Sequence, residues 1–565
     1  MSTSILPWHS LPRWCERTWS LAKVRPVMSS EGLIMAGCVY FSLFSNAMFW
    51  RSAAPALPGQ WLWAASLFLL VTAVHGVWLS VLVWERTART VLTALLLVSA
   101  LAGHYMAAYG IYIDADMIRN VLHTDWREAS ELAGMDSVLS LLPSLPPIVL
   151  VWRVKVQRRS WKPAVLARVA LLASLVLMAA AGAAASTQRL TAFLRNQREV
   201  RYLVTPANVL VSLAKVVSEE PPGKARIQTP IGEDAVQSPA AGRRRPRLLV
   251  LVVGETARAA NWGLNGYARQ TTPELAMRGV INFPHVTACG SSTEVSLPCM
   301  FSVLGRERYD EKEIRGQQSL LHVLQRAGVA TRWRDNQSGC KGVCSGLPQE
   351  DLRARGDAET CTERRCFDEV LLQDLPAVVA KHRGDQVIVL HMLGNHGPNY
   401  FERYPPAFRR YMPVCETSDL GRCSREQIIN AYDNALLYTD HVLAGAIDQL
   451  KTVPGYDTAL LYVSDHGESL GEKGLYLHGM PRALAPREQL EVPMVAWFSE
   501  GWQRATQLDE RCARKQAGSG LFSHDNLFHT VLGLTDVKTT LYRPDHDIFL
   551  TCRADNAGPV SGGSP

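Results

Sequence analysis

The chain has 565 residues, of which 47% are hydrophobic and 20% are charged, and its formal net charge is +7. A charge content this low, with so many apolar residues, excludes a disordered chain. The long apolar runs are concentrated in the first third of the sequence, which disfavours an ordinary soluble enzyme. The excess positive charge lies largely in short loops beside these runs, so it indicates membrane topology and not nucleic-acid binding.

Five segments are apolar and long enough to cross a bilayer, which needs roughly 20 helical residues. The predicted spans are Gly32–Trp50, Trp61–Trp84, Val91–Ile113, Val138–Trp152 and Val165–Ala185. The fourth span contains Pro143, Pro146 and Pro147. Proline is tolerated in a span when neighbouring helices satisfy the backbone carbonyls that it frees.

Lysine and arginine are concentrated in alternate loops between these spans. They precede the first span, follow the second as Arg86 and Arg89, and recur between the fourth and fifth, whereas residues 114–136 are rich in acids. By the positive-inside rule the N-terminus is cytoplasmic, and everything after Ala185 lies outside. A cleaved signal peptide ending near residues 54–56 is the alternative, which the four later spans disfavour.

The cysteines give a second indication of topology. Of twelve, only Cys15 and Cys38 precede the second span, and the other ten lie in the part placed outside. Their short spacings suggest disulfides in an oxidising compartment, periplasmic or extracellular. The natural local pairing is 289–299, 340–344, 361–366 and 415–423, with 512–552 left over. A zinc–cysteine pair at Cys361 and Cys366 is the alternative, but no second pair lies at zinc-ribbon spacing.

The region after the last span divides into three parts. Residues 187–216 mix apolar residues with arginines, as in a helix that lies on a membrane surface. Residues 218–247 are rich in Pro, Gly, Ala and charge, which is typical of a linker. We therefore predict a transmembrane domain at 1–186, a surface helix and linker at 187–247, a catalytic domain at 248–555 and a disordered tail at 556–565.

Short apolar runs alternate with helix-like stretches after the linker. The predicted strands are Arg247–Val253, Gly328–Trp333, Gln386–His391, Thr458–Ser464 and Val492–Phe498. The predicted helices are Gln317–Ala327, Asp368–Ala380 and Ile428–Leu450. This alternation predicts an α/β domain with a mostly parallel sheet, whose functional site lies at the carboxyl ends of the strands.

Polar residues follow three of these strands directly. Glu255 comes after the first strand, His396 shortly after the third, and Asp465 and His466 after the fourth. Carboxylates and imidazoles that converge on one sheet edge make a metal site of mixed oxygen and nitrogen ligands. Such a set suits zinc first and manganese second.

A candidate nucleophile lies in the small-residue loop CGSSTEVSLPC at residues 289–299. A helix that begins at Thr293 would direct free N–H groups and the positive end of its dipole at an anion such as phosphate. A metal would activate the threonine hydroxyl for attack. Alternatively, Ser292 or Thr293 merely caps the helix, and the residues alone leave these two interpretations open.

Six strings, taken in order, carry a specific resemblance. They are VVGETARAANWGLNGYARQTTPEL, ACGSSTEVSLPCMFS, RDNQSGCKGVC, LHMLGNHGPNYFERYP, INAYDNALLYTD and LYVSDHGESLGEKGLYLHGMPRALAPREQ. From about Gly32 to Cys552 the chain resembles the lipid A phosphoethanolamine transferases, a family that includes the mobile colistin-resistance enzymes. The resemblance implies an N-terminal five-helix transmembrane domain and a periplasmic α/β domain of the alkaline-phosphatase/sulfatase type.

The resemblance also implies roles for individual residues. It implies that one zinc ion, with a second possible, is held by Glu255, Thr293, Asp465 and His466, and that Thr293 is the nucleophile. His396 and His478 correspond to histidines that hold the headgroup phosphate or a second metal and assist proton transfer. The remaining positions that correspond to substrate contacts are Asn120, Thr124, Glu128, Ser338 and Lys341. Gln337 stands where some members carry Asn, so no contact is assigned to it.

The function that the resemblance implies is transfer of phosphoethanolamine from phosphatidylethanolamine to a lipid A phosphate, through a covalent phosphothreonine-type intermediate. Such a protein is a monomer in the bacterial inner membrane, with a cytoplasmic N-terminus and a periplasmic catalytic domain, and it confers polymyxin and colistin resistance. One alternative is a phosphoglycerol transferase or sulfatase-like hydrolase of the same superfamily. Another is a catalytically inactive membrane sensor on this scaffold.

Overall fold

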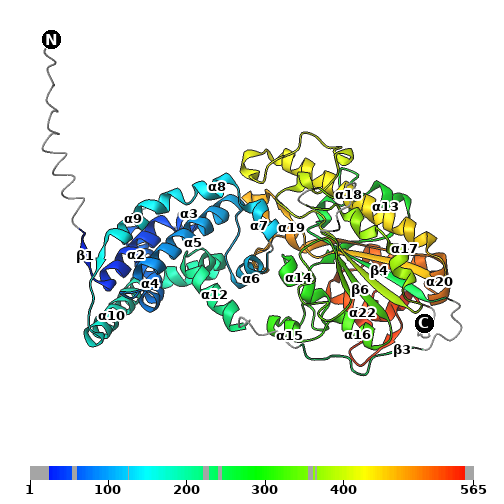
Figure 1. Ribbon diagram of the computed structural model, residues 1–565, viewed down its shortest axis with the longest axis horizontal. Helices are drawn as coiled ribbons and strands as arrows, with labels where there is room; N and C mark the ends of the chain where they lie inside the picture. The colour runs from blue at the N-terminus through cyan, green and yellow to red at the C-terminus, as the bar shows by residue number, and fades with distance from the viewer. Residues whose placement is uncertain are drawn as a thin grey trace, which may run out of the picture. The chain divides into compact units, whose positions relative to one another are not determined.

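The computed structural model describes residues 25–53, 60–124, 126–219, 228–238, 245–353, 355, 360–362 and 365–553, without the side chains of residues 127, 128, 196, 198 and 199. The chain forms two compact units (Figure 1). The first unit comprises residues 1–107 and 135–211, and the second comprises 108–134 and 212–565. Cys15, the possible cleavage site at 54–56 and the predicted tail at 556–565 lie outside the described residues.

The N-terminal region is a set of apolar helices. Among the described residues, four helices are long and apolar enough to cross a membrane, and a bent pair makes a fifth when it is counted as one span. The four are α4 (Trp61–Leu82), α5 (Ala88–Tyr109), the segment Met135–Arg153 and α10 (Trp161–Ala185). Met135–Arg153 comprises α8 (Met135–Leu139), a 3₁₀ turn and α9 (Leu145–Arg153). The bent pair is α2 (Ser30–Phe44) and α3 (Ala47–Ala53). The prediction of several membrane-spanning helices in this region is confirmed.

The first predicted span is not one straight helix. It divides into α2 and α3, which are bent by 57°. Asn46 lies at the break, and its side-chain amide donates hydrogen bonds to the carbonyls of Phe41, 2.7 Å away, and Thr205, 2.9 Å away. These bonds satisfy carbonyls that would otherwise be unpaired in an apolar setting, so the break is stabilised locally.

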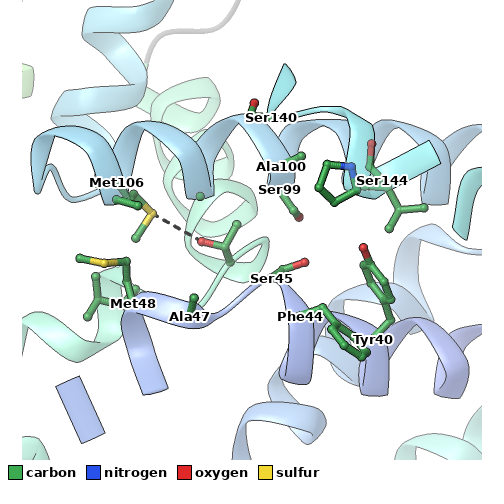
Figure 2. Close-up of a pocket in the computed structure, with 16 residues that line it drawn as sticks. Tyr40, Phe44, Ser45, Ala47, Met48, Ser99, Ala100, Met106, Ser140 and Ser144 are labelled. Carbon is green, nitrogen blue, oxygen red and sulfur yellow. Dashed lines mark hydrogen bonds between the residues drawn. The ribbon is translucent and has the colours of Figure 1, made fainter. Parts of the chain in front are cut away.

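A pocket of about 210 Å³ lies beside this break (Figure 2). Its wall combines apolar side chains, such as Phe44 and Met106, with hydroxyl groups, such as Ser99 and Ser144. The hydroxyl of Thr205 contacts the Met106 sulfur at 3.7 Å. The pocket therefore belongs entirely to the apolar unit.

An eight-stranded sheet forms the centre of the second unit. In sheet order the strands are β13 (Phe522–Ser523), β5 (Ile281–Thr287), β12 (Glu491–Phe498), β9 (Asp457–Ser464), β4 (Arg247–Gly254), β8 (Gln386–His391), β6 (Ala330–Asp335) and β7 (Gln349–Asp351). Every pairing is parallel except those of β12, which runs antiparallel to both β5 and β9. The predicted α/β fold with a mostly parallel sheet is confirmed.

The five predicted strands all form, but β5, β7 and β13 were not predicted. The polar alternation and Pro284 in β5 obscure its strand character, and β7 and β13 have only three and two residues. Such short or polar edge elements carry little apolar signal. The sequence therefore predicts the buried centre of the sheet better than its edges.

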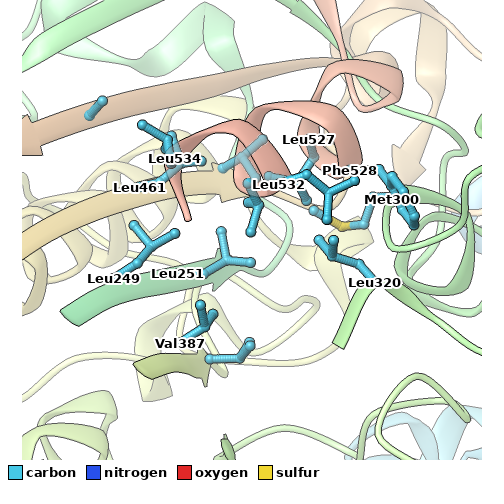
Figure 3. Close-up of a cluster of buried hydrophobic side chains, with 14 of the residues drawn as sticks. Leu249, Leu251, Met300, Leu320, Val387, Leu461, Leu527, Phe528, Leu532 and Leu534 are labelled. Carbon is cyan, nitrogen blue, oxygen red and sulfur yellow. The ribbon is translucent and has the colours of Figure 1, made fainter. Parts of the chain in front are cut away.

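Helices cover both faces of the sheet. Leu249 and Leu251 of β4 lie in one core cluster with Leu320 of α16 (Leu320–Arg326) and Phe528 of α22 (Asp525–Leu534) (Figure 3). The alternate β4 residues Leu248, Val250 and Val252 are equally buried, on the face that α17 (Leu375–Ala380) and α18 (Arg425–Thr452) cover (Figure 1). Burial of both faces explains why this strand reads as a continuous apolar run.

The helices of the second unit include long and short elements. They are α6 (Ala115–His123), α7 (Trp126–Leu132), α13 (Pro273–Met277), α14 (Thr293–Met300), α15 (Glu311–Gly316), α16 (Leu320–Arg326), α17 (Leu375–Ala380), α18 (Arg425–Thr452), α19 (Arg487–Leu490), α20 (Glu500–Thr506), α21 (Glu510–Ser519) and α22 (Asp525–Leu534). The predicted helix at 368–380 is instead a 3₁₀ turn at Asp368–Leu372 followed by α17. The chain breaks there because Asp374 has a φ of 56°, outside the helical range.

The segment 108–134 packs with the second unit although its sequence follows an apolar helix. Helix α5 ends before Gly110, which has a φ of 71°. In α6 the guanidinium of Arg119, only 1% exposed, lies 2.7 Å from Glu219. In α7 the carboxylate of Glu131 lies 2.5 Å from Arg403. These ion pairs hold the segment against the rest of the unit.

The region predicted as surface helix and linker is more structured than expected. Residues 187–219 form α11 (Thr187–Asn196), a 3₁₀ helix (Arg198–Tyr202) and α12 (Ala207–Glu219), not one continuous helix. Within the predicted linker, β3 (Val236–Gln237) pairs antiparallel with β14 (Val537–Lys538). Part of the linker is therefore fixed by backbone hydrogen bonds from a segment far along the chain.

Five disulfides form in the second unit, and they are the five pairs predicted from spacing. They join 289–299, 340–344, 361–366, 415–423 and 512–552. The zinc–cysteine interpretation of Cys361 and Cys366 is wrong, because these two are bonded to each other. Cys38 is buried and unbonded.

We expect thiol titration of the denatured, unreduced protein to detect only Cys15 and Cys38. Reduction should destabilise the second unit, and the 512–552 disulfide should contribute most because it closes the longest loop. Loop-closure entropy assigns it about 4 kcal/mol, against about 2 kcal/mol for 340–344. Denaturant unfolding of single-disulfide serine variants measures this order, and four or more free thiols in the unreduced protein would contradict the pairing.

Candidate functional site

Three predicted ligands lie together at the carboxyl ends of two neighbouring strands. Glu255 follows β4, and Asp465 and His466 follow β9. The two strands are parallel and paired up to Gly254 and Ser464, so the residues that come next leave the sheet side by side. One ligand atom from each of the three residues lies within 4.8 Å of the others, and all three side chains are fully buried.

Thr293 completes this cluster. It is the first residue of α14, and its hydroxyl donates to Glu255 Oε2 over 3.0 Å and lies 3.3 Å from His466 Nε2. Ser292 occupies the N-cap position, but its side chain makes no capping hydrogen bond. The Cys289–Cys299 disulfide closes the loop around the two residues. The helix therefore places a hydroxyl among metal-ligand groups, at its positive end.

The donor atoms fit a metal ion. His466 Nδ1 lies 2.9 Å from the Gly467 carbonyl, which only accepts, so Nδ1 carries a proton and Nε2 offers a lone pair to the cluster. Asp465 Oδ1 accepts from the backbone N–H of Thr256 and of His466. Asp465 Oδ2 is buried and accepts no hydrogen bond from any described residue. Such an orphaned oxygen is what a bound cation would satisfy.

The electrostatics of the cluster also indicate a missing positive charge. Burial and the neighbouring Glu255 carboxylate raise the pKa of Asp465. Burial acts to lower the pKa of His466, but the carboxylates of Asp465 and Glu255 outweigh it and raise the pKa to about 9. Two buried carboxylates so close together repel each other unless a cation lies between them.

The backbone beside the cluster is strained. Thr256, directly after Glu255, has a φ of 59°, a left-handed conformation that β-branched residues rarely adopt. Its N–H donates to Asp465, and its hydroxyl donates to Glu255. Strain of this kind persists where surrounding contacts enforce it, and it is common at functional sites.

The two further histidines lie beside the cluster. The ring of His478, which follows the short hairpin of β10 (Ser469–Leu470) and β11 (Tyr476–Leu477), is 4.4 Å from the ring of His466. The ring of His396 is 5.4 Å from that of His478. Glu468, fully buried, lies 3.3 Å from His478 Nδ1 and orients its ring. The structure therefore brings both predicted histidines to the site.

Lys341 and Ser338 lie on the loop after β6. Lys341 Nζ is 3.8 Å from Glu294 Oε2, next to Thr293 in sequence. The hydroxyl of Ser338 donates to the side chain of Gln337, which is itself buried. Lys341 is thus close to the first turn of α14, whereas the Ser338 hydroxyl is hydrogen-bonded to its neighbour Gln337.

The predicted ethanolamine contacts lie on α6 and α7. Thr124 ends α6, and its hydroxyl donates to the Asn120 carbonyl over 2.7 Å. Glu128 lies in α7, but its side chain is outside the described part of the structure. Helix α6 reaches α14 through His123, whose Nδ1 is 2.8 Å from Glu294 Oε1.

Sequence reasoning assigned no role to Glu294 or Glu468. Glu294 is fully buried between His123, Arg315 and Lys341, and Glu468 orients His478. A signal for Glu294 was present, since it is the one charged residue in the string CGSSTEVSLPC. Charged residues are rarely buried unless they are paired, so a glutamate in a buried helix indicates that oppositely charged side chains lie next to it.

Residues 247–537 match the Sulfatase family, and this match defines the class of the second unit. Residues 71–220 match the family of phosphoethanolamine transferases EptA/EptB. Phosphoethanolamine transferase EptA of Escherichia coli (strain K12) is 38% identical over 539 residues, or 94% of this chain and 98% of the relative. Phosphatidylethanolamine transferase Mcr-1 of Escherichia coli is 38% identical over 466 residues, or 80% and 84%.

A solved structure agrees over the same length. The integral membrane protein lipooligosaccharide phosphoethanolamine transferase A (EptA) from Neisseria meningitidis is 37% identical and superposes with a TM-score of 0.88, covering 94% of this chain and all of that one. The chain therefore belongs to the phosphoethanolamine transferase family. The resemblance that rested on six sequence strings is confirmed.

Proposed function

We propose that this protein transfers phosphoethanolamine from phosphatidylethanolamine to a phosphate of lipid A. One observation carries the proposal: the Thr293 hydroxyl lies at a helix N-terminus within 3.0 Å of Glu255 and 3.3 Å of His466. A hydroxyl held among metal ligands at an anion-binding helix end suits attack on phosphorus. The names of the relatives contain phosphoethanolamine, phosphatidylethanolamine and lipooligosaccharide, and these words support the proposed transferred group, donor and class of acceptor.

The reaction takes two displacements. The Thr293 oxygen attacks the donor phosphorus and bonds to it, while the bond to the diacylglycerol oxygen breaks and that oxygen takes a proton. A lipid A phosphate oxygen then attacks the same phosphorus, and the Thr293 oxygen leaves. We propose that His396 and His478 exchange these protons and that the positive charge of Lys341 stabilises the phosphoryl oxygens. The short ring distances from His466 to His478 and from His478 to His396 support the first role, and the contact of Lys341 with Glu294 supports the second.

Glu255, Asp465, His466 and Thr293 would hold the zinc ion, and His396 and His478 would be ligands of a second one. Bound zinc would polarise the phosphoryl oxygens and lower the pKa of the Thr293 hydroxyl. The chain's own part is to orient the ligands: Gly467 fixes the ring of His466, and Thr256 fixes the carboxylate of Asp465.

The proposed setting is the bacterial inner membrane, with the N-terminus in the cytoplasm and the five disulfides in the periplasm, where disulfides persist. We propose that the protein acts there as a monomer. Each transferred group adds an ammonium to lipid A, which reduces its negative charge. A less anionic surface attracts cationic peptides less, so the activity confers resistance to polymyxin and colistin.

Two other functions use the same cluster. A phosphoglycerol transferase or sulfatase-like hydrolase would act on a headgroup without an ammonium, and an inactive sensor would bind lipid without turnover. The presence of the metal-ligand cluster disfavours the inactive sensor, and the family of the chain favours the transferase over the hydrolase. An assay with phosphatidylglycerol as the sole donor distinguishes the phosphoglycerol transferase from the proposed transferase. Any turnover of a lipid donor excludes the inactive sensor.

A trapping experiment tests the proposal directly. Full-length protein in vesicles of phosphatidylethanolamine, without lipid A, should release diacylglycerol and carry one phosphoethanolamine on Thr293. Peptide mapping by mass spectrometry locates the group. An adduct on Ser292, or release of free phosphoethanolamine without an adduct, would contradict the assigned nucleophile.

We expect Glu128→Ala to reduce lipid transfer about tenfold without changing metal content. The carboxylate is proposed to pair with the ethanolamine ammonium, and a charge-assisted hydrogen bond contributes roughly 1.5–3 kcal/mol. Glu426→Ala, which removes an exposed carboxylate from the first turn of α18, is the control and should be neutral. Equal activity of Glu128→Ala and wild type on phosphatidylethanolamine vesicles would remove Glu128 from the donor site.

A further inference from the structure

Glu294 is a buried carboxylate directly beside the nucleophile. It has no exposed surface and lies in the first turn of α14. Its Oε1 is 2.8 Å from His123 Nδ1 and accepts from Arg315 Nη2 over 2.7 Å. The same Arg315 nitrogen donates to the Glu294 backbone carbonyl over 2.6 Å. One side chain therefore joins three parts of the unit: α6, α14 and α15.

The other oxygen of Glu294 points toward Lys341. Glu294 Oε2 is buried and accepts no hydrogen bond from any described residue, while Lys341 Nζ lies 3.8 Å away. Lys341 is 8% exposed and has a φ of 47°, so its backbone is strained, and it lies in the loop that the Cys340–Cys344 disulfide closes. The lysine is thus fixed at both its backbone and its ammonium.

We propose that Glu294 is a positioning residue for phosphoryl transfer, which holds Lys341 beside the first turn of α14 and fastens α6 to that helix through His123. This inference rests on the proposed function, because it takes Lys341 as the group that contacts the transferred phosphate. Glu294 itself is not a substrate contact. Arg315 and Lys341 already balance its charge, and burial keeps a ligand ammonium from its carboxylate.

The geometry predicts a particular kinetic effect. Without the carboxylate, Lys341 keeps its charge but loses the partner that fixes its ammonium beside the first turn of α14. The positive charge near the phosphate is then undiminished, so binding of the headgroup phosphate does not weaken. Stabilisation of the transition state does weaken, because the lysine is no longer fixed in place. The expected loss is therefore in kcat and not in KM.

The test uses the isosteric variant Glu294→Gln in the full-length protein, with vesicles of phosphatidylethanolamine and added lipid A. We expect kcat to fall roughly tenfold with KM unchanged or lower. Glu313→Gln, an exposed carboxylate on α15, is the matched control and should match wild type. An unchanged kcat, or a loss that appears only as a raised KM, would overturn the proposal.

A double variant separates positioning from a general structural role. In a Lys341→Met background, Glu294→Gln should cause little further loss, because the group that it positions is gone. An equal loss in both backgrounds would overturn action through Lys341.

If Glu294→Gln does not fold, His123→Asn at the partly exposed end of α6 serves instead. The proposal expects a lower kcat for this variant, and an unchanged kcat would contradict it. Wild-type protein without any transfer would refute the proposed function itself, and with it the reason to position Lys341.

Discussion

Thr293→Ala is expected to lower phosphoethanolamine transfer by at least about a thousandfold while the protein stays folded. The substitution removes the proposed attacking oxygen from the cluster of Glu255 and His466, but it deletes only a hydroxyl and a methyl group at the start of α14. Among the described contacts one other hydroxyl, that of Thr256, also reaches Glu255. Ser292 is the neighbouring hydroxyl in sequence, and its side chain makes no capping hydrogen bond at the N-cap of α14.

The rate of diacylglycerol release from phosphatidylethanolamine vesicles measures this effect. Thr293→Ser is the matched control, because it keeps the hydroxyl and should retain a substantial part of the rate. Thermal unfolding of both variants should resemble that of wild type. Retention of most activity by Thr293→Ala would reassign the nucleophile, with Ser292 as the next candidate.

Glu255→Ala and Asp465→Ala are each expected to lose bound zinc as well as activity. Each substitution deletes a charged ligand from a cluster in which all three side chains are buried. Loss of an outer hydrogen-bond partner alone weakens metal binding about 10- to 100-fold, so loss of a direct ligand should weaken it more. In each variant only one of the two carboxylates is left to attract the cation.

Metal analysis of the purified variants checks this expectation. Asp433→Asn is a suitable control, because Asp433 is also a buried carboxylate but is held by Asn261, Tyr267 and Arg269 away from the cluster. That variant should keep its metal even if its stability falls. Wild-type zinc content in Glu255→Ala or Asp465→Ala would contradict the assigned site.

The ligand cluster was predictable because each ligand directly follows a buried strand. The apolar runs that become β4 and β9 end at Gly254 and Ser464, so the carboxyl-end rule alone brings Glu255 next to Asp465 and His466. The disulfides were predictable for a related reason, since four of the five join cysteines no more than ten residues apart. Short separations leave a signal in the sequence.

Contacts between distant segments were not predictable in the same way. His123 and Glu294 are 171 residues apart, and nothing in either string indicates the other. The packing of 108–134 with the second unit depends on such pairs, as Arg119 and Glu131 show. The break between α2 and α3 likewise depends on the Asn46 contact with Thr205, 159 residues away. Tertiary hydrogen bonds, and not local pattern, determine these features.

Mass spectrometry of lipid A tests the central claim most directly. The lipid is taken from cells grown with isotopically labelled ethanolamine that carry the wild-type protein, Thr293→Ala or no copy of the gene. We predict labelled phosphoethanolamine on lipid A in the wild-type cells, and none above background in the other two. Lipid A that is unmodified in the wild-type cells, or modified equally with Thr293→Ala, would contradict the account.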